Sequence, residues 1–387
     1  MSEWEIFDEN LGNAKIKVFG VGGGGGNAVK HMIDQKIEGA DFISINTDKQ
    51  ALDNNPSPQK LILGENITNG MGAGADPEIG RLAALEDIER LKELIKGADM
   101  VFIASGMGGG TGTGASPIVA QVAKELGALT VAIVTKPFSL EGKRKMSLAQ
   151  DGINQMVEEV DSLITIPNQK LLEVLGKGCT MVDGFKAAND VLAGAVRGIS
   201  DIIIKPGMIN VDFADVKTVM SEKGIAMMGT GSASGPNRAM EAAEQAMGSK
   251  LLEDIDLKDA KGILLNITAG ENLTIEEFET VGNYVQEYAS EEAIFVPGTV
   301  IDEASGDTLT VTVVATGLAS KKEKQNATTN KINFLETKRE LPLSSASKQI
   351  IENPPNIEML KQLKGNQSQE LEEELLDIPS FMRSQID

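Results

Sequence analysis

The stretch GGGTGTG, residues 108–114, contains five glycines and two threonines and follows the apolar run MVFIASG at residues 100–106. An apolar run of this length predicts a buried β-strand, and glycines at its end let the backbone approach a phosphate closely. The amides at the N-terminus of a following helix would point at the same anion. The stretch holds no lysine. It therefore predicts a phosphate-binding loop whose charge is balanced elsewhere.

Two further glycine-rich segments share this character: GVGGGGGN at residues 20–27 and GMGAGADPE at residues 70–78. None of the three contains lysine or arginine, and the pattern GxxxxGK[ST] is absent, which argues against a P-loop enzyme. Two helix N-termini supply about +1 against roughly −4 for a nucleoside triphosphate. A magnesium ion on the β and γ oxygens is the simplest remedy.

Around these segments, apolar runs of strand length alternate with longer helical patterns, which is typical of a mostly parallel, doubly wound sheet. One long helical pattern, residues 181–205, is apolar over much of its circumference and predicts a helix buried between two domains. The strands expected before it are 15–21, 41–47, 60–63, 100–106, 129–135 and 162–167, with helices at 78–97 and 115–126. Beyond it, residues 222–318 predict a smaller α+β domain.

Composition restricts the function further. The chain has 387 residues, of which 41% are hydrophobic and 24% charged, and a net charge of −21. So acidic a protein is a poor match for nucleic acid. No apolar stretch reaches the length of a membrane span, so we expect a cytoplasmic protein that does not insert into membranes. Cys179, the only cysteine, cannot form an internal disulfide, and His31, the only histidine, is expected to be a helix-surface or packing residue.

With these features in place, the chain resembles the FtsZ family of bacterial, tubulin-like cell-division GTPases. The resemblance covers residues 13–318 and returns in the last dozen positions. Besides the first two glycine-rich segments, the motifs that carry it, in this order, are INTD (45–48), PFSLEG (137–142), IPNQKLL (166–172), FKAANDVL (185–192) and NVDFADV (210–216). The resemblance implies a tubulin-like fold and a site for GTP or GDP with Mg²⁺.

Carried over one position at a time, the resemblance implies three groups of nucleotide contacts. The phosphate cradle would comprise Gly22, Gly23, Gly24, Gly25, Gly26, Asn27, Gly110, Thr111 and Gly112, with Ala73 and Gly74 near the γ end. Glu141 and Asn168 would contact the sugar, and Phe185, Asn189 and Asp190 the guanine. Alternatives stay open: Phe185 could be a core residue, and Asn189 or Asp190 a capping or otherwise satisfied polar group.

One position departs from the pattern of many relatives. Lys145 stands where they have arginine, and lysine keeps the charge but loses the bidentate fork. Lys145 is kept as a nucleotide contact, although Arg144 could substitute for it, and either could belong to a solvated basic face.

The acids of NVDFADV raise a geometric question, because a carboxylate close to a triphosphate in the same subunit is repelled by it. The resemblance implies that subunits stack head to tail, so that Asp212 and Asp215 act on the next subunit's GTP while Asn210 orients their loop. An unclosed head-to-tail interface gives an open filament. The alternative for the acid pair is a helix N-cap with a first-turn acid.

The resemblance and the composition together divide the chain into segments. We expect a flexible N-terminal segment and a disordered linker on either side of the folded body, with a partner-binding peptide at the end. The expected boundaries are 1–12, then 13–180 for GTP binding, 181–221 for the long helix and acid loop, 222–318 for the α+β domain, 319–370 for the linker and 371–387 for the peptide.

Partners and place in the cell follow from the resemblance alone. The chain would assemble with itself at the midcell division ring beneath the inner membrane. Leu375–Asp387 would bind membrane-anchoring division proteins such as the actin-like FtsA, and other division regulators would bind elsewhere. Two rival functions stay open: a nicotinamide-dependent oxidoreductase using Gly20, Gly22 and Gly25, and a scaffold that binds GTP without hydrolysing it.

Overall fold

A computed structural model describes residues 14–318 except 177, 206, 210 and 253–256. The predicted N-terminal segment, linker and C-terminal peptide lie outside the described residues. By their contacts the described residues belong to one compact unit, Met1–Lys321. Among them, no helix combines the length and the apolar character that crossing a membrane requires.

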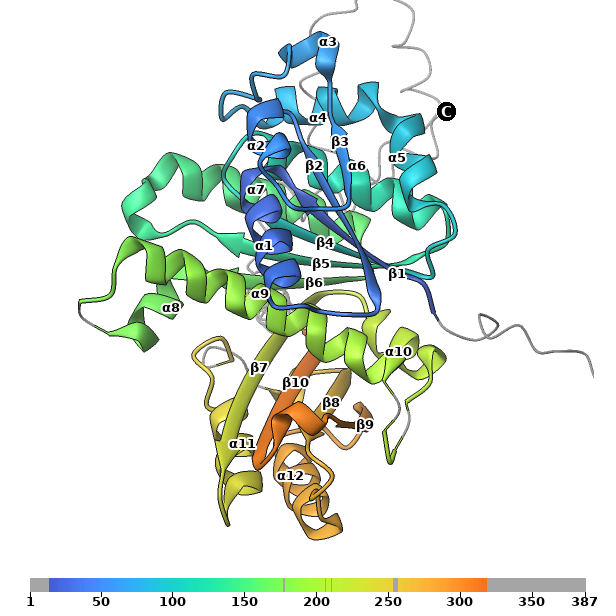
Figure 1. The fold of residues 1–387 in the computed structure, drawn as a ribbon, viewed down its shortest axis with the longest axis vertical. Helices are drawn as coiled ribbons and strands as arrows, with labels where there is room; N and C mark the ends of the chain where they lie inside the picture. Colours follow the sequence, from blue (N-terminus) through green and yellow to red (C-terminus); the bar gives the residue numbers. More distant parts are fainter. Residues whose placement is uncertain (1–13, 177, 206, 210, 253–256, 319–387) are drawn as a thin grey trace, which may run out of the picture. The chain divides into compact units, whose positions relative to one another are not determined.

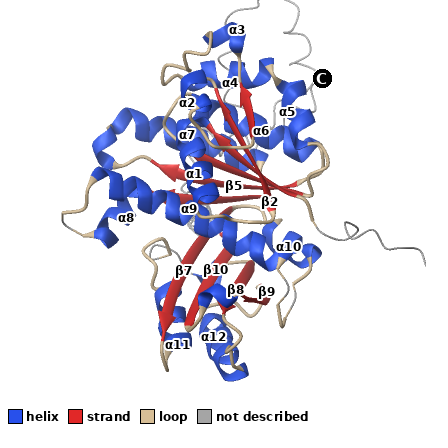
Figure 2. Ribbon diagram, in the orientation of Figure 1, coloured by secondary structure: helices blue, strands red, loops and turns tan. Residues whose placement is uncertain are grey.

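One ten-stranded sheet runs through the described chain, in the order β3-β2-β1-β4-β5-β6-β7-β10-β8-β9 (Figures 1 and 2). The first six strands pair in parallel, whereas β10 pairs antiparallel with both β7 and β8. The strands are β1 (Ile16–Val21), β2 (Ala40–Asn46), β3 (Gln59–Ile62), β4 (Met100–Gly106), β5 (Leu129–Lys136), β6 (Ser162–Pro167), β7 (Ile225–Ser234), β8 (Gly262–Ala269), β9 (Ile294–Ile301) and β10 (Thr308–Leu318). The six expected N-terminal strands are confirmed, with ends that shift by at most one residue.

Twelve α-helices occur in the described part of the chain. They are α1 (Gly22–Asp34), α2 (Lys49–Asp53), α3 (Glu65–Thr68), α4 (Pro77–Glu86), α5 (Ile88–Ile95), α6 (Thr111–Glu125), α7 (Lys143–Glu159), α8 (Asn168–Leu175), α9 (Met181–Ile204), α10 (Phe213–Met220), α11 (Arg238–Met247) and α12 (Ile275–Glu287). The predicted long helix is confirmed as α9.

Alternate side chains of the parallel strands pack on opposite faces of the sheet. On β1, Val18 belongs to the cluster formed with α1, α9 and α10, while Phe19 belongs to the cluster formed with α4 to α7. Helices therefore cover both faces of this half, which confirms the doubly wound prediction. In the other half, α11 and α12 pack against one face of β7 to β10.

The two halves of the sheet join at a narrow seam. Only Leu163–Ile225 and Ile164–Ala226 pair β6 with β7. The central helix α9 contributes to the apolar cluster that holds residues from β5, β6, β7 and β8, and Figure 1 shows it between the two halves. We call these halves, residues 14–180 and 222–318, the N-terminal lobe and the C-terminal lobe.

The single helix expected at residues 78–97 is wrong. Asp87 ends α4 and separates it from α5, because its buried carboxylate accepts a hydrogen bond from the backbone N–H of Gly64 at 2.7 Å and another from Arg90 at 2.9 Å. A contact 23 residues away in the sequence therefore overrides a continuous helical pattern.

Candidate functional site

Two of the three glycine-rich segments, residues 20–27 and 108–114, meet at the carboxyl ends of neighbouring strands. β1 leads into α1 and β4 leads towards α6, and the strands pair up to Val21–Ser105. A Cβ at Gly22 would lie 2.8 Å from the backbone nitrogen of Gly112. One at Gly24 would lie 3.0 Å from the Cα of Gly106. The backbones therefore touch at points where no side chain fits.

The segment at residues 70–76 joins this contact. A Cβ at Gly110 would lie 2.8 Å from the Cβ of Ala73, so the two loops also pack backbone to backbone. The hydroxyls of Thr47 and Thr111 are hydrogen-bonded at 2.6 Å, which ties INTD to GGGTGTG. The structure thus gathers the three glycine-rich segments of the sequence at one edge of the sheet.

The helices that start here begin inside the glycine runs, earlier than expected. Gly22–Gly26 form the start of α1, and Thr111–Gly114 form the start of α6. Neither helix has a side-chain cap or an acidic residue in its first turn. Among the other described helices, α7 and α8 also lack both, whereas α4, α9 and α12 are capped by Asp76, Thr180 and Thr274. The first amides of α1 and α6 are therefore left for another acceptor, as at known anion sites.

Within the three glycine-rich segments, three glycines face open space. A Cβ at Gly23, Gly74 or Gly109 would meet no protein atom within 4 Å. Of these, only Gly74 has a positive φ, of +58°. Neither backbone conformation nor protein packing therefore requires glycine at positions 23 and 109. A bound group pressed against the backbone would require it.

A cavity of about 280 Å³ opens beside these loops. Its volume lies near the lower end of the range for small-molecule sites. It is lined by Gly24, Asn27, Gly106, Met107, Gly108, Gly109, Thr135, Pro137, Glu141, Lys145, Asn168, Phe185, Ala188, Asn189 and Leu192. Seven of the predicted contacts thus share one cavity: Gly24, Asn27, Glu141, Lys145, Asn168, Phe185 and Asn189.

Phe185 stands on the wall of this cavity and is not a core residue. Its side chain is 45% exposed, and its ring meets the buried ring of Phe138 edge-on, with centroids 5.2 Å apart at 89°. Edge-to-face packing is favourable and leaves one ring face uncovered. Phe185 can therefore stack on a planar base.

Among the residues that the structure describes, Lys145 is the only cationic side chain on the cavity wall, and Arg144 does not line it. The Lys145 ammonium lies 3.1 Å from Oε2 of Glu141, whose Oε1 accepts the backbone N–H of Phe138 at 2.9 Å. Lys136 follows the wall residue Thr135, and burial lowers the pKa of its ammonium. The cavity therefore carries little net positive charge of its own.

Asn168 begins α8 at the cavity and is 4% exposed. Its Oδ1 is buried and has no hydrogen-bond partner within the part of the chain that the structure describes. Buried polar atoms are almost always paired, because an unpaired one costs about 1–3 kcal/mol. A ligand hydroxyl would supply the missing donor.

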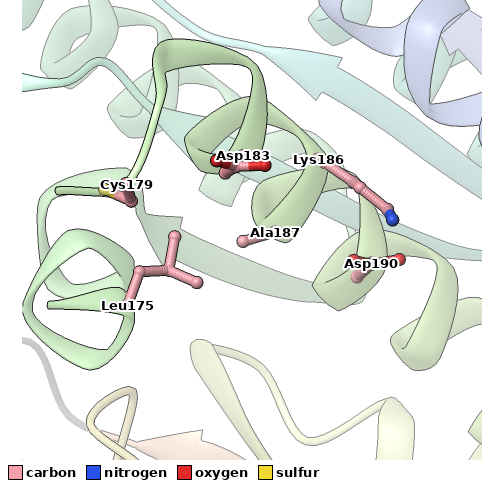
Figure 3. Close-up of a pocket in the computed structure, with 6 residues that line it drawn as sticks. All are labelled: Leu175, Cys179, Asp183, Lys186, Ala187 and Asp190. Atoms are coloured by element: carbon pink, nitrogen blue, oxygen red, sulfur yellow. The ribbon is translucent and has the colours of Figure 1, made fainter.

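Asp190 is not brought into this cavity. It lines a second, more open cavity of about 360 Å³ with Cys179, Lys186 and others (Figure 3). Its Oδ1 lies 2.6 Å from Nε2 of His31 and accepts a hydrogen bond from Gln35 at 3.0 Å. His31 thus connects α1 to α9, in keeping with a packing role.

The acid pair lies at the far end of α9 from the cavity. From Phe185 to the end of the helix the chain rises roughly 28 Å at 1.5 Å per residue. Asp212 then caps α10, because its carboxylate accepts the backbone N–H of Asp215 at 2.8 Å. Both acids are exposed, and Asn210 lies outside the described residues. The N-cap alternative is confirmed as local structure, and it leaves the outer carboxylate oxygens available.

Sequence reasoning missed part of the cavity wall. Gly108 and Gly109 lie within GGGTGTG and were not assigned contacts, while Thr135 is the second-last residue of β5 and Pro137 follows that strand. The position of the last two could have been inferred, because ligands bind where parallel strands end. Leu192 and Ala188 carry no such signal.

The described residues contain no group of three or more side chains of the kind that bind a metal ion. A magnesium ion held mainly by nucleotide phosphates and water needs no such group.

Two family models match the chain, one on each side of α9 and α10. The GTPase domain of the Tubulin/FtsZ family matches residues 15–176, and the C-terminal domain of the FtsZ family matches residues 224–319. These matches are to a GTPase family and give the oxidoreductase alternative no support.

Individual relatives agree with the family matches. The chain is 61% identical over 321 residues to the cell division protein FtsZ of Pseudomonas aeruginosa, covering 83% of this chain and 82% of that protein. It is 54% identical over 380 residues to FtsZ of Buchnera aphidicola, covering 97% and 98%. A solved FtsZ dimer from M. jannaschii superposes with a TM-score of 0.76 at 43% identity, covering 80% of this chain and 89% of that one.

Proposed function

The chain belongs to the FtsZ family of tubulin-like cell-division GTPases, and from this premise we propose that it hydrolyses GTP where two copies meet head to tail. The separation of the cavity from the acid pair along α9 carries the proposal. A subunit cannot bring its own Asp212 and Asp215 to its own cavity across a buried helix of 24 residues. A neighbouring subunit's acids can approach the cavity from outside.

The roles of the cavity residues follow from their chemistry. The open amides of α1 and α6 hold the phosphates, and Gly23 and Gly109 leave room for them. Asn168 and Glu141 accept from the sugar hydroxyls, Phe185 stacks on guanine, and Asn189 contacts its edge. Lys145 supplies one positive charge.

Magnesium supplies charge compensation for the β and γ phosphates when the nucleotide is bound. The protein contributes what the metal does not: uncapped helix N-termini that orient the phosphates, and carboxylates that arrive from the next subunit. Asp212 and Asp215 then position and polarise the attacking water, with Asn210 orienting their loop. Phosphoryl transfer depends mostly on such positioning and charge stabilisation.

Assembly is therefore part of the active site. Each subunit offers a cavity at one end and acids at the other, so the contact is heterologous and extends into a filament. The dimer of the 43% identical M. jannaschii relative supports self-association. We place the filament in the cytoplasm at the midcell ring, with Leu375–Asp387, outside the described residues, binding anchors such as FtsA.

Mixing two inactive variants tests this proposal. One chain carries Asp212→Ala with Asp215→Ala, and the other carries Gly109→Val, which puts a branched side chain into the cradle where no protein atom stands. Random co-assembly at equal amounts places an intact cavity against intact acids at about a quarter of the interfaces. We expect phosphate release near that fraction of the wild-type rate, although each variant alone is inactive.

The control mixes the first variant with a chain that carries both sets of substitutions. Both chains of this mixture lack the acids, so every interface lacks them. Co-assembly is measured by sedimentation in each case. Absence of turnover in a confirmed co-polymer of the two single-defect chains would contradict the shared site.

A further inference from the structure

The segment between α9 and α10, which leads to the acid pair, is hydrogen-bonded to the C-terminal lobe at Ile209. The backbone N–H of Ile209 donates to Oγ1 of Thr299 at 2.9 Å. The backbone N–H of Thr299 in turn donates to the carbonyl oxygen of Ile209 at 3.2 Å. Thr299 is 3% exposed and lies in β9, in register with Ile267 of β8. One buried threonine therefore holds Ile209 at two points.

Two described residues of the segment, Gly207 and Val211, also pack closely against β9. A Cβ at Gly207 would collide with the carbonyl oxygen of Thr299, so the two backbones are in direct contact. A Cβ at Gly298 would lie 2.8 Å from Cγ2 of Val211, and Val211 itself is 6% exposed. Both sides of Ile209 are thus pressed against the Gly298–Thr299 stretch.

An ion pair secures the end of α9 just before this segment. Lys205 lies 3.1 Å from the carboxylate of Asp201 and 3.9 Å from that of Asp302, which follows β9. Lys205 and Ile209 therefore both contact the β9 edge of the C-terminal lobe. Asp212 comes three residues after Ile209 and starts α10 directly.

We propose that Thr299 is a positioning residue for hydrolysis, which sets the place of Asp212 and Asp215 through its two hydrogen bonds to Ile209. This inference rests on the proposed function, because it matters only if those acids act on a neighbour's nucleotide. Thr299 touches no nucleotide and no acid. Through Thr299, the C-terminal lobe determines the positions of Asp212 and Asp215, although the nucleotide cavity lies in the N-terminal lobe and on α9.

The Thr299 hydroxyl can be removed or kept by substitution, which tests its hydrogen bond to Ile209 separately from the backbone contact. Thr299→Val keeps the shape and the backbone N–H but removes the acceptor, leaving the Ile209 amide unpaired. Thr299→Ser keeps the acceptor. Misplacing a catalytic group by about 1 Å costs up to a hundredfold in rate, so we expect turnover per assembled subunit to fall roughly tenfold or more in Thr299→Val. The equilibrium Kd for GTP should stay unchanged, and Thr299→Ser should restore most of the rate.

The experiment compares these two variants with Thr130→Val, in which a buried hydroxyl that donates to Ala128 in the N-terminal lobe is lost. Phosphate release per sedimented subunit, GTP binding and thermal unfolding are measured for each. To keep the test decisive if Thr299→Val assembles poorly, it is combined with Gly109→Val and co-assembled with the Asp212→Ala, Asp215→Ala chain. In that mixture Thr299→Val acts only as the acid donor.

Each outcome then bears on the inference. A low rate with normal GTP binding, rescued by serine and absent from Thr130→Val, supports it. An unchanged rate in the mixture overturns it, and so does failure of serine to rescue. If the Asp212→Ala, Asp215→Ala chain alone hydrolyses GTP normally, the proposed function fails instead, which separates the two failures.

Discussion

The cavity end of the N-terminal lobe and the junction of α11 with α12 in the C-terminal lobe treat their polar groups in opposite ways. At the cavity, α1 and α6 begin without side-chain caps, and a buried oxygen of Asn168 has no partner among the described residues. At that junction, a buried guanidinium is satisfied by four hydrogen bonds. The first arrangement leaves hydrogen-bonding capacity for a ligand, whereas the second uses that capacity to hold the fold.

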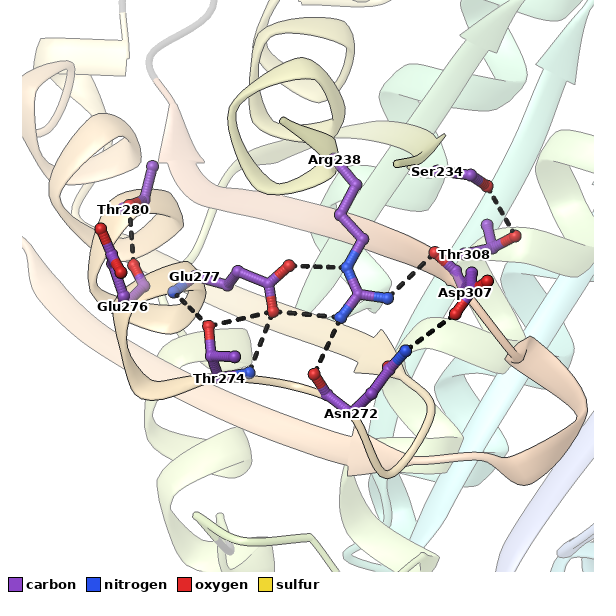
Figure 4. A network of polar contacts seen from close by, with 9 residues as sticks. All are labelled: Ser234, Arg238, Asn272, Thr274, Glu276, Glu277, Thr280, Asp307 and Thr308. Atoms are coloured by element: carbon purple, nitrogen blue, oxygen red, sulfur yellow. Dashed lines mark hydrogen bonds and ion pairs between the residues drawn. The ribbon is translucent and has the colours of Figure 1, made fainter. Parts of the chain in front are cut away.

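The satisfied group is Arg238, at the start of α11 (Figure 4). It donates to both carboxylate oxygens of Glu277, at 2.6 and 3.0 Å, and to the carbonyl oxygens of Asp307 at 2.9 Å and Asn272 at 3.1 Å. Glu277 also accepts from Thr274, completing the capping box of α12. One network thus ties α11, α12 and the loop before β10 together.

The largest effect we expect comes from breaking this network. Arg238→Met leaves the Glu277 carboxylate partly buried without its partner, which costs about 3–5 kcal/mol of unfolding free energy. The matched control is Arg81→Met, which removes an arginine paired with Glu78 at 2.6 Å on the exposed face of α4. Urea unfolding followed by circular dichroism should show a large loss in the first variant and an unchanged midpoint in the second.

The same network predicts a pH dependence. The hydrogen bonds from Arg238 lower the pKa of Glu277 from 4.5 to about 2. A carboxyl group with a lowered folded pKa stabilises the protein above its unfolded pKa and loses that contribution as pH falls. Wild-type stability should therefore drop between about pH 4.5 and pH 2, and Glu277→Gln should remove this component of the drop. An equal slope in both proteins would show that Glu277 does not contribute.

A smaller effect separates the two kinds of glycine at the cavity. A Cβ at Gly112 would lie 2.6 Å from the carbonyl oxygen of Gly106 and 2.7 Å from Oγ of Ser105. Gly112→Ala should therefore cost about 1–3 kcal/mol by overpacking, with weaker GTP binding. Gly109→Ala meets no protein atom, so its unfolding free energy should match wild type while the Kd for GTP rises. Normal GTP affinity in Gly109→Ala would mean that no phosphate sits against residue 109.

The contrast also explains which parts of the molecule the sequence could predict. The six parallel strands and α9 follow from apolar runs, which are local signals. The gathering of the glycine loops was expected from the family resemblance. The break at Asp87, the two-point contact of Thr299 and the orientation of Asp190 towards His31 depend on partners far away in the sequence. Of the predicted site residues, those on the cavity wall were found through motifs, and Thr135 was missed because a strand end carries no motif.

The smallest effect on stability separates the structural and chemical roles of Asp212. As an N-cap, the Asp212 carboxylate accepts a hydrogen bond from the backbone N–H of Asp215. Asparagine caps a helix about as well as aspartate does. Asp212→Asn should therefore leave the unfolding free energy within a few tenths of a kcal/mol of wild type. Asp212→Ala should lose about 1 kcal/mol. If the charge acts on a neighbour's nucleotide, both variants lose phosphate release per assembled subunit to a similar degree, despite their different stabilities. A fully active Asp212→Asn would reduce this residue to a helix cap, because asparagine keeps the hydrogen bond and removes only the charge.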